Sequence, residues 1–228
     1  METKRVKKSK IDVQILSASA VFGALSAVLT FVPSLRFPIL PYLRFELAEL
    51  PVMVGTFIYG PVLGIISSFA YWIILNFIGE FQPYGPFMKF LSVLGMIIGT
   101  WIGVGIIRKL KLSASPGFGL ILSLAAFIRI VLMSMLNYIM LLVLLPSFLD
   151  LAANSLSASL GLKFQSSLDA MILIVIFTGI FNLIHTILSM IPAYSIVKVV
   201  FYKRSLLRMR KPWISSVIED TTKSNSSN

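Results

Sequence analysis

The sequence AELPVMVGTFIYGPVLGIISSFAYWIILNFIG, residues 48–79, decides the fold class of the chain. It is apolar along almost its whole length, and it exceeds the roughly 20 residues that one helix needs to cross a bilayer. The tripeptide Tyr-Gly-Pro at 59–61 divides it, because proline disfavours a helical conformation at the residue before it. We therefore predict two helices here, at about 48–59 and 61–78.

Further apolar runs on either side of this stretch predict four more helices, each about long enough to span a membrane. They cover about 13–32, 86–107, 117–145 and 169–201. The first run ends at Pro33 and the third at Pro146. Residues 33–47 are typical of a loop or a partly re-entrant segment, and 147–168 includes a short interfacial helix. We predict an all-α integral membrane protein with six transmembrane helices.

The composition agrees with a membrane protein. Of the 228 residues, 57% are hydrophobic and 13% are charged, and the mean hydropathy is +0.91. A soluble domain carries about 25% charged residues. The chain has no cysteine, which excludes disulfides, thiolate metal sites and a cysteine nucleophile.

The formal charge of +11 gathers in basic clusters that flank the apolar runs, at 4–10, 108–111 and 198–211. Because cytoplasmic segments of membrane proteins are enriched in lysine and arginine, this placement indicates topogenic charge rather than nucleic-acid binding. Attraction to the lipid surface accompanies it. We expect a membrane protein with both termini in the cytoplasm.

This orientation gives three parts along the chain. Residues 1–12 form a basic cytoplasmic N-terminus, and residues 13–205 form the six-helix membrane domain. Residues 206–228 form a basic and then polar cytoplasmic tail, which we expect to be disordered from Thr221.

Motifs of catalysis are missing from the sequence. It has no G-x-x-x-x-G-K-[ST] phosphate loop, no H-E-x-x-H and no G-x-S-x-G, and a single histidine cannot build a multi-histidine metal site. We expect no catalytic residues, no metal and no cofactor, and we do not expect an enzyme.

Polar side chains inside the apolar runs are the candidates for a binding site. Asn137 lies in the fifth predicted helix, Asn182 and His185 in the sixth, and Asn76 near the end of the third. A separation of three places Asn182 and His185 on one helical face. Buried amides need partners in lipid, so contacts between helices explain any single asparagine equally well. Together they favour a pocket for a neutral, hydrogen-bonding, partly apolar solute.

Arg129 precedes Asn137 by eight residues in the same helix. Intramembrane arginines usually face protein or water and are functional candidates. The alternative, in which its long side chain reaches the membrane surface, is about equally supported by the sequence.

Small residues mark one further feature, in the first helix. The residues Ala20, Gly23, Ala24 and Ala27 form overlapping small-x-x-x-small pairs, which permit close approach of another helix. That helix is either a neighbour in the same chain or part of a partner.

The run FPILPYLRFELAELPVMVGTFIYGPVLGII, residues 37–66, resembles the S components of energy-coupling factor (ECF) transporters, and in particular their riboflavin-specific branch (the RibU type). Two other runs, RIVLMSMLNY at 129–138 and IFNLIH at 180–185, resemble that branch's R-I-x-x-M-x-x-x-N-Y and P-F-N-L-I-K. The similarity extends to about residue 205. It implies an S-component bundle in the plasma membrane of a prokaryote. The bundle would bind riboflavin, or FMN, as the transported ligand and dock with a transmembrane coupling subunit and two ATPase subunits.

The resemblance also implies roles for individual residues. Asn137 and Asn182 match the asparagines that bind the pyrimidine edge of the isoalloxazine, while His185 stands where the family has lysine. The first loop contributes residues that line or cover the pocket, namely Tyr42, Leu43 and Phe45. The small-residue face with Ala20 and Ala24 resembles the surface that docks with the coupling subunit.

Alternative functions remain at this stage. Because His185 departs from the family pattern, the same fold could bind another vitamin or a precursor. A third hypothesis, from a different class, is an intramembrane enzyme or sensor that uses His185 and Arg129.

Overall fold

The structure is a computed structural model, and it describes residues 13–112, 114–207 and 211–218. The predicted basic N-terminus at 1–12 and the polar tail from Thr221 lie outside these ranges.

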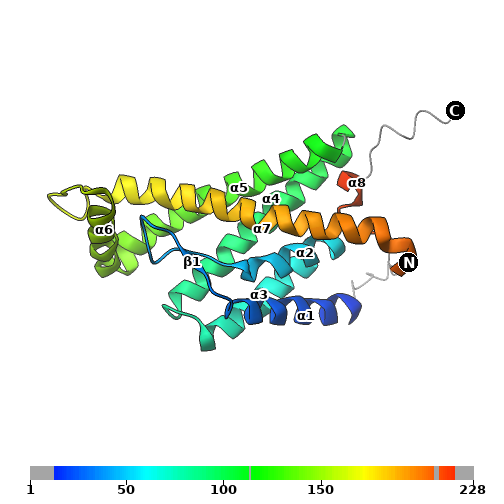
Figure 1. The fold of residues 1–228 in the computed structure, drawn as a ribbon, viewed down its shortest axis with the longest axis horizontal. Coiled ribbons are helices and arrows are strands. Elements are labelled where there is room, and N and C mark those ends of the chain that lie inside the picture. The colour runs from blue at the N-terminus through cyan, green and yellow to red at the C-terminus, as the bar shows by residue number, and fades with distance from the viewer. Residues whose placement is uncertain (1–12, 113, 208–210, 219–228) are drawn as a thin grey trace, which may run out of the picture.

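The described chain is almost entirely helical (Figure 1). The helices are α1 (Val13–Leu29), α2 (Leu50–Tyr59), α3 (Pro61–Ile78), α4 (Tyr84–Leu110), α5 (Ala114–Ile139), α6 (Pro146–Leu160), α7 (Met171–Leu207) and α8 (Ser215–Ile218). Four of the described helical segments are long and apolar enough to cross a membrane, at Pro61–Ile78, Tyr84–Leu110, Pro116–Leu144 and Met171–Lys203. The shorter apolar helices Val13–Leu29 and Leu47–Tyr59 complete the six-helix membrane bundle that the sequence predicts.

The break between α2 and α3 lies where the sequence places it. Gly60 has a φ of 101°, a region that favours glycine, and its N–H donates to the carbonyl of Thr56 at the end of α2. Pro61 then occupies the first turn of α3, where the missing N–H of proline leaves no helical hydrogen bond unmade. The tripeptide thus ends one helix and begins the next.

Helices α4 and α5 pack through a row of glycines on α4. A Cβ at Gly99 would lie 2.4 Å from Ala125 Cα, and a Cβ at Gly95 would lie 3.2 Å from Arg129 Cα. Gly103 makes the same kind of approach to Ile121. Close backbone approach through small residues is the usual basis of helix packing in membranes. Here it brings Arg129 against α4 and into the bundle.

One end of the bundle, called the hairpin end below, carries the connections from α1 to α2, from α3 to α4 and from α5 through α6 to α7 (Figure 1). Strands β1 (Leu35–Arg36) and β2 (Arg44–Phe45) pair there as an antiparallel hairpin, and α6 lies beside the start of α7 (Figure 1). Arg44 Nη1 donates to Glu80 Oε1 at 2.8 Å, which ties β2 to the turn between α3 and α4. Helix α6 lies where the sequence predicts a short helix, within 147–168 apart from its first residue.

At the other end, called the α8 end, residues 211–218 fold back onto the bundle as a strap. The backbone N–H groups of Trp213 and Ile214 donate to the carbonyls of Ile58 and Phe57 at 2.8 and 3.0 Å. Arg108 donates to the Trp213 carbonyl at 2.7 Å and lies over its ring. The strap therefore supplies partners to the last carbonyls of α2, which no helical N–H can reach.

Candidate functional site

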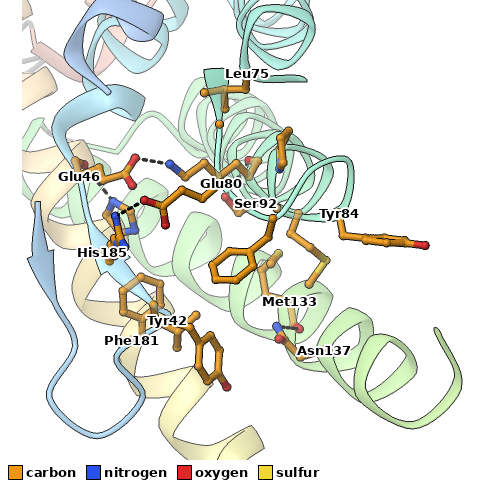
Figure 2. Close-up of a pocket in the computed structure, with 18 of the residues that line it drawn as sticks. Tyr42, Glu46, Leu75, Glu80, Tyr84, Ser92, Met133, Asn137, Phe181 and His185 are labelled. Atoms are coloured by element: carbon orange, nitrogen blue, oxygen red, sulfur yellow. Dashed lines mark hydrogen bonds and ion pairs between the residues drawn. The ribbon is translucent and has the colours of Figure 1, made fainter. Parts of the chain in front are cut away.

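A cavity of about 570 Å³ lies at the hairpin end, between the loop before α2 and the helices α3, α4, α5 and α7. Its size falls within the range of about 300–1,000 Å³ that small-molecule sites occupy. Figure 2 shows Tyr42, Phe181 and His185 on one side of it and Met133 and Asn137 on the other. The cavity thus joins the two helices that carry the predicted polar residues.

A buried ion pair forms the floor of the cavity. Arg129 is 1% exposed and Glu49 is 2% exposed. Their contact is bidentate, with Arg129 Nη1 at 2.6 Å from Glu49 Oε2 and Nη2 at 2.9 Å from Oε1. Ser92 and Ser189 also donate to the carboxylate, at 3.3 and 3.0 Å. A buried charge needs such a full set of partners, because water cannot solvate it.

Asn182 continues this network. Its Oδ1 accepts from Arg129 Nε at 3.0 Å, and its Nδ2 donates to the carbonyl of Thr178 at 2.9 Å. The carboxamide is 2% exposed and lines the cavity. One N–H of the amide keeps no partner in these contacts and is available to a ligand.

His185 is held at both ring nitrogens. Its Nδ1 lies 3.2 Å from Arg129 Nη2, and its Nε2 lies 3.1 Å from the backbone carbonyl of Glu46. The Glu46 carboxylate in turn forms an ion pair with Lys89. The ring therefore links the floor of the cavity to the loop that precedes α2.

Asn137 lies on α5, two turns beyond Arg129. Its Nδ2 donates to the carbonyl of Met133 at 2.8 Å, so its Oδ1 and one N–H remain available to the cavity. The cavity is thus lined by carboxamides from α5 and α7, and both also make backbone contacts within their own helices.

Aromatic rings close one wall. Phe45 and Phe181 have centroids 4.7 Å apart, and His185 meets both rings edge-on. Phe45 is not among the residues that line the cavity and instead packs behind Phe181. Tyr42 and Leu43 do line it.

The Tyr42 hydroxyl is buried without a hydrogen-bond partner. Burial raises the pKa of this phenol well above its usual value, so it stays protonated at physiological pH. It is a donor that a ligand could use.

Asn76 does not lie in the cavity. Its Nδ2 donates to the carbonyl of Trp72 at 2.8 Å, and the residue is absent from the lining of the cavity. The structure therefore groups Asn137, Asn182 and His185 and leaves Asn76 apart.

The sequence alone does not show the role of Glu49, because its partner Arg129 lies 80 residues further along the chain. The sequence signal for such a pair is an acidic residue directly before an apolar helix, in a chain with one arginine deep in another span.

Within the described residues, histidine, aspartate and glutamate form no group of three or more that could hold a metal ion.

The four small residues of α1 lie in two different environments in the structure. Gly23 and Ala27 are buried, and a Cβ at Gly23 would lie 2.9 Å from the Ser67 carbonyl oxygen of α3. Ala20 and Ala24 are exposed. Packing within the chain accounts for the first pair, and the second pair remains open to a partner.

Comparison with known proteins agrees with this architecture. The family model of the ECF transporter, substrate-specific component, matches residues 16–197. The riboflavin transporter RibU of Staphylococcus aureus (strain TCH60) is 31% identical over 142 residues, which are 60% of this chain and 71% of that protein.

A solved structure of the S component of a bacterial ECF transporter superimposes with a TM-score of 0.60 at 25% identity. The match covers 87% of this chain and 99% of that one. The six-helix bundle and the family match over 16–197 together identify the chain as a member of the substrate-specific (S) components of ECF transporters, multi-pass proteins of the prokaryotic cell membrane.

Proposed function

We propose that the chain is the S component of a vitamin importer that binds riboflavin. The observation that carries the proposal is a single cavity lined by carboxamides from both α5 and α7 beside an aromatic wall. An isoalloxazine is a flat apolar plate with an imide edge, and amides can pair with such an edge while aromatic and methionine side chains cover the plate. The likeness to the Staphylococcus aureus riboflavin transporter supports the same ligand.

The ribityl chain of riboflavin needs hydroxyl partners outside this apolar region. The unpartnered hydroxyl of Tyr42 and the polar loop residues near the rim of the cavity meet that need. We place the hairpin end on the extracellular side, because the basic segment 108–111 and the strap lie at the α8 end. Riboflavin then enters from outside.

Uptake requires an energy source that this chain lacks, since its sequence contains no phosphate loop. We propose that it docks with a transmembrane coupling subunit and two ATPase subunits and has no enzymatic activity of its own. The exposed residues Ala20 and Ala24 of α1 are the proposed docking contacts.

The test is direct. The purified protein in detergent is titrated with riboflavin, and quenching of flavin fluorescence measures binding. Saturable quenching at one site per chain supports the proposal, whereas protein that leaves flavin fluorescence unchanged contradicts it.

A second candidate is another vitamin or precursor, favoured by His185 at the position of the family lysine. Mass spectrometry of the small molecule that copurifies separates the two candidates. FMN is titrated beside riboflavin to determine whether a phosphate is tolerated.

A further inference from the structure

Arg129 and Glu49 lie beneath the proposed ligand contacts, and Arg129 is hydrogen-bonded to two of them, Asn182 and His185. We propose that Arg129, held by Glu49, is a positioning residue that fixes which hydrogen-bonding atoms the cavity floor presents to the ligand. The inference deepens the proposed function and rests on it for the identity of the ligand.

The first step is the rigidity of Arg129. A guanidinium has a planar fork of donors, and both oxygens of Glu49 accept from its two terminal nitrogens. The pair is buried, and Gly95 brings the α5 backbone at Arg129 close to α4. The third nitrogen, Nε, then points in a direction that the ion pair determines.

That direction sets the orientation of Asn182. Because Arg129 Nε can only donate, the atom of the carboxamide that faces it must be the oxygen. The Thr178 carbonyl can only accept, so it takes one N–H from the other end of the same amide. Asn182 is therefore held with its remaining N–H as the group free to donate to a ligand.

The same reasoning sets the state of His185. Arg129 Nη2 donates, so Nδ1 must be an unprotonated acceptor. The carbonyl of Glu46 accepts, so Nε2 must carry the proton. Nε2 also lies 3.7 Å from Glu49 Oε2, which is too long for a hydrogen bond. His185 is thus a neutral Nε2–H imidazole whose two nitrogens both belong to the protein.

The cavity floor consequently has a defined polarity. Asn182 offers a donor, His185 offers no hydrogen-bonding atom, and Asn137 offers an acceptor oxygen together with one N–H. A ligand must place a carbonyl or imine acceptor at Asn182, and an adjacent imide N–H can meet Asn137. Charge is also balanced, since Glu49 and Arg129 neutralise each other and His185 adds none, so the floor favours a neutral edge.

The tautomer of His185 is measurable because the chain contains one histidine. Protein with a histidine-free affinity tag is grown with ¹⁵N-labelled histidine, and its imidazole resonances are recorded at pH 7.5 without ligand. The expected spectrum shows one protonated nitrogen, Nε2, and one unprotonated nitrogen, Nδ1. The double variant Glu49→Gln/Arg129→Gln removes the donor to Nδ1 and leaves the Glu46 carbonyl beside Nε2, so we expect the Nδ1 resonance to shift to that of an imidazole nitrogen without a hydrogen bond. A protonated Nδ1 in the wild-type protein, or an unchanged spectrum in the double variant, overturns the proposal.

The effect on binding is measured by a cycle with Asn182→Ala. Glu49→Gln/Arg129→Gln should weaken riboflavin affinity on the order of tenfold when Asn182 is present, because the amide loses its fixed orientation. In the Asn182→Ala background the same change should have less than about a twofold effect. Equal losses in both backgrounds would mean that Arg129 acts only on the general structure, and would overturn the proposal. Arg108→Gln, at the α8 end, is the matched control and should leave affinity unchanged.

The two experiments separate this inference from the proposed function. If wild-type protein does not bind riboflavin, the proposed function fails, and the histidine spectrum still decides whether Arg129 positions the floor. If riboflavin binds but the cycle is additive, the positioning role fails and the proposed function stands.

Discussion

At the residue scale, the site depends on one arginine whose five N–H donors are shared among four side chains. Arg129 lies on α5, and its partners come from three other parts of the bundle. They are Glu49 directly before α2, Met96 on α4, and Asn182 and His185 on α7. Removing one member of a buried ion pair leaves the other without compensation, whereas removing both charges together can be nearly neutral.

This gives a prediction for stability. Glu49→Ala should destabilise the protein by about 3–5 kcal/mol, because Arg129 then stays buried without a counter-charge. The neutral double variant Glu49→Gln/Arg129→Gln should be destabilised less than this single variant. Thermal unfolding of the ligand-free protein in detergent compares the two. A single variant that unfolds at the wild-type temperature would contradict the role of the pair.

The carboxamide of Asn137 gives a prediction for binding. Asn137→Ala should weaken riboflavin affinity by about 1–3 kcal/mol, since a polar edge of the ligand is left buried and unpaired. Asn76→Ala is the matched control, because this amide lies on α3 outside the cavity. Fluorescence titration of both variants is the measurement. Equal affinities for the two would remove Asn137 from the site.

At the element scale, the position of α5 relative to α4 depends on the row of glycines. Gly99 approaches the α5 backbone so closely that even a methyl group has no room, while a Cβ at Gly105, on the same helix, meets nothing within 4 Å. The two glycines therefore separate the effect of packing from the effect of helix propensity.

Gly99→Ala should lower the unfolding temperature, because the added Cβ would force α4 and α5 apart against backbone atoms. Gly105→Ala should leave that temperature unchanged or raise it slightly, because alanine is the better helix former. We also expect Gly99→Ala to weaken ligand binding, since Arg129 projects from the displaced helix. If the two variants unfold alike, the close approach does not support the bundle.

The strap gives a second prediction at this scale. Its hydrogen bonds to the last carbonyls of α2 are made by backbone N–H groups, while the Trp213 ring lies against Gly60 and under Arg108. Trp213→Ala should therefore release the strap from the bundle and make residues 211–218 more accessible to protease. Limited proteolysis should show faster loss of the C-terminal segment, with riboflavin affinity unchanged. Equal cleavage of both proteins would show that the ring does not hold the strap.

The sequence predicts those features of the fold that depend on one continuous stretch of residues. Apolar runs and prolines define the helices and the break at Gly60, because hydrophobic length and backbone restriction are local properties. The polar pair on α7 was also visible, because three residues span one turn. Neither the partner of Arg129 nor the strap was predictable, because each depends on which helices meet. The sequence also contains the glycines of α4, but only the structure shows which helix they face.

At the scale of the whole molecule, the two ends of the bundle differ in structure: one contains the cavity and the other contains the strap. The hairpin end holds the cavity, two ion pairs that anchor the segment before α2, and the short helix α6. The α8 end carries the basic segment 108–111 and the strap. Helix α1 runs between the ends along the outside of the bundle, packed on α3 by one face, so its other face can meet a partner without disturbing the cavity (Figure 1).

From this separation we predict that assembly and binding are independent. Ala20→Leu and Ala24→Leu should block copurification with the coupling subunit, because larger side chains prevent the close approach that small residues allow. Riboflavin affinity of the isolated chain should stay at the wild-type value, since neither alanine lines the cavity. Val131→Leu, an exposed position on α5, is the control and should affect neither measurement. If the alanine variants assemble normally but lose affinity, the outer face of α1 supports the site and not the partner.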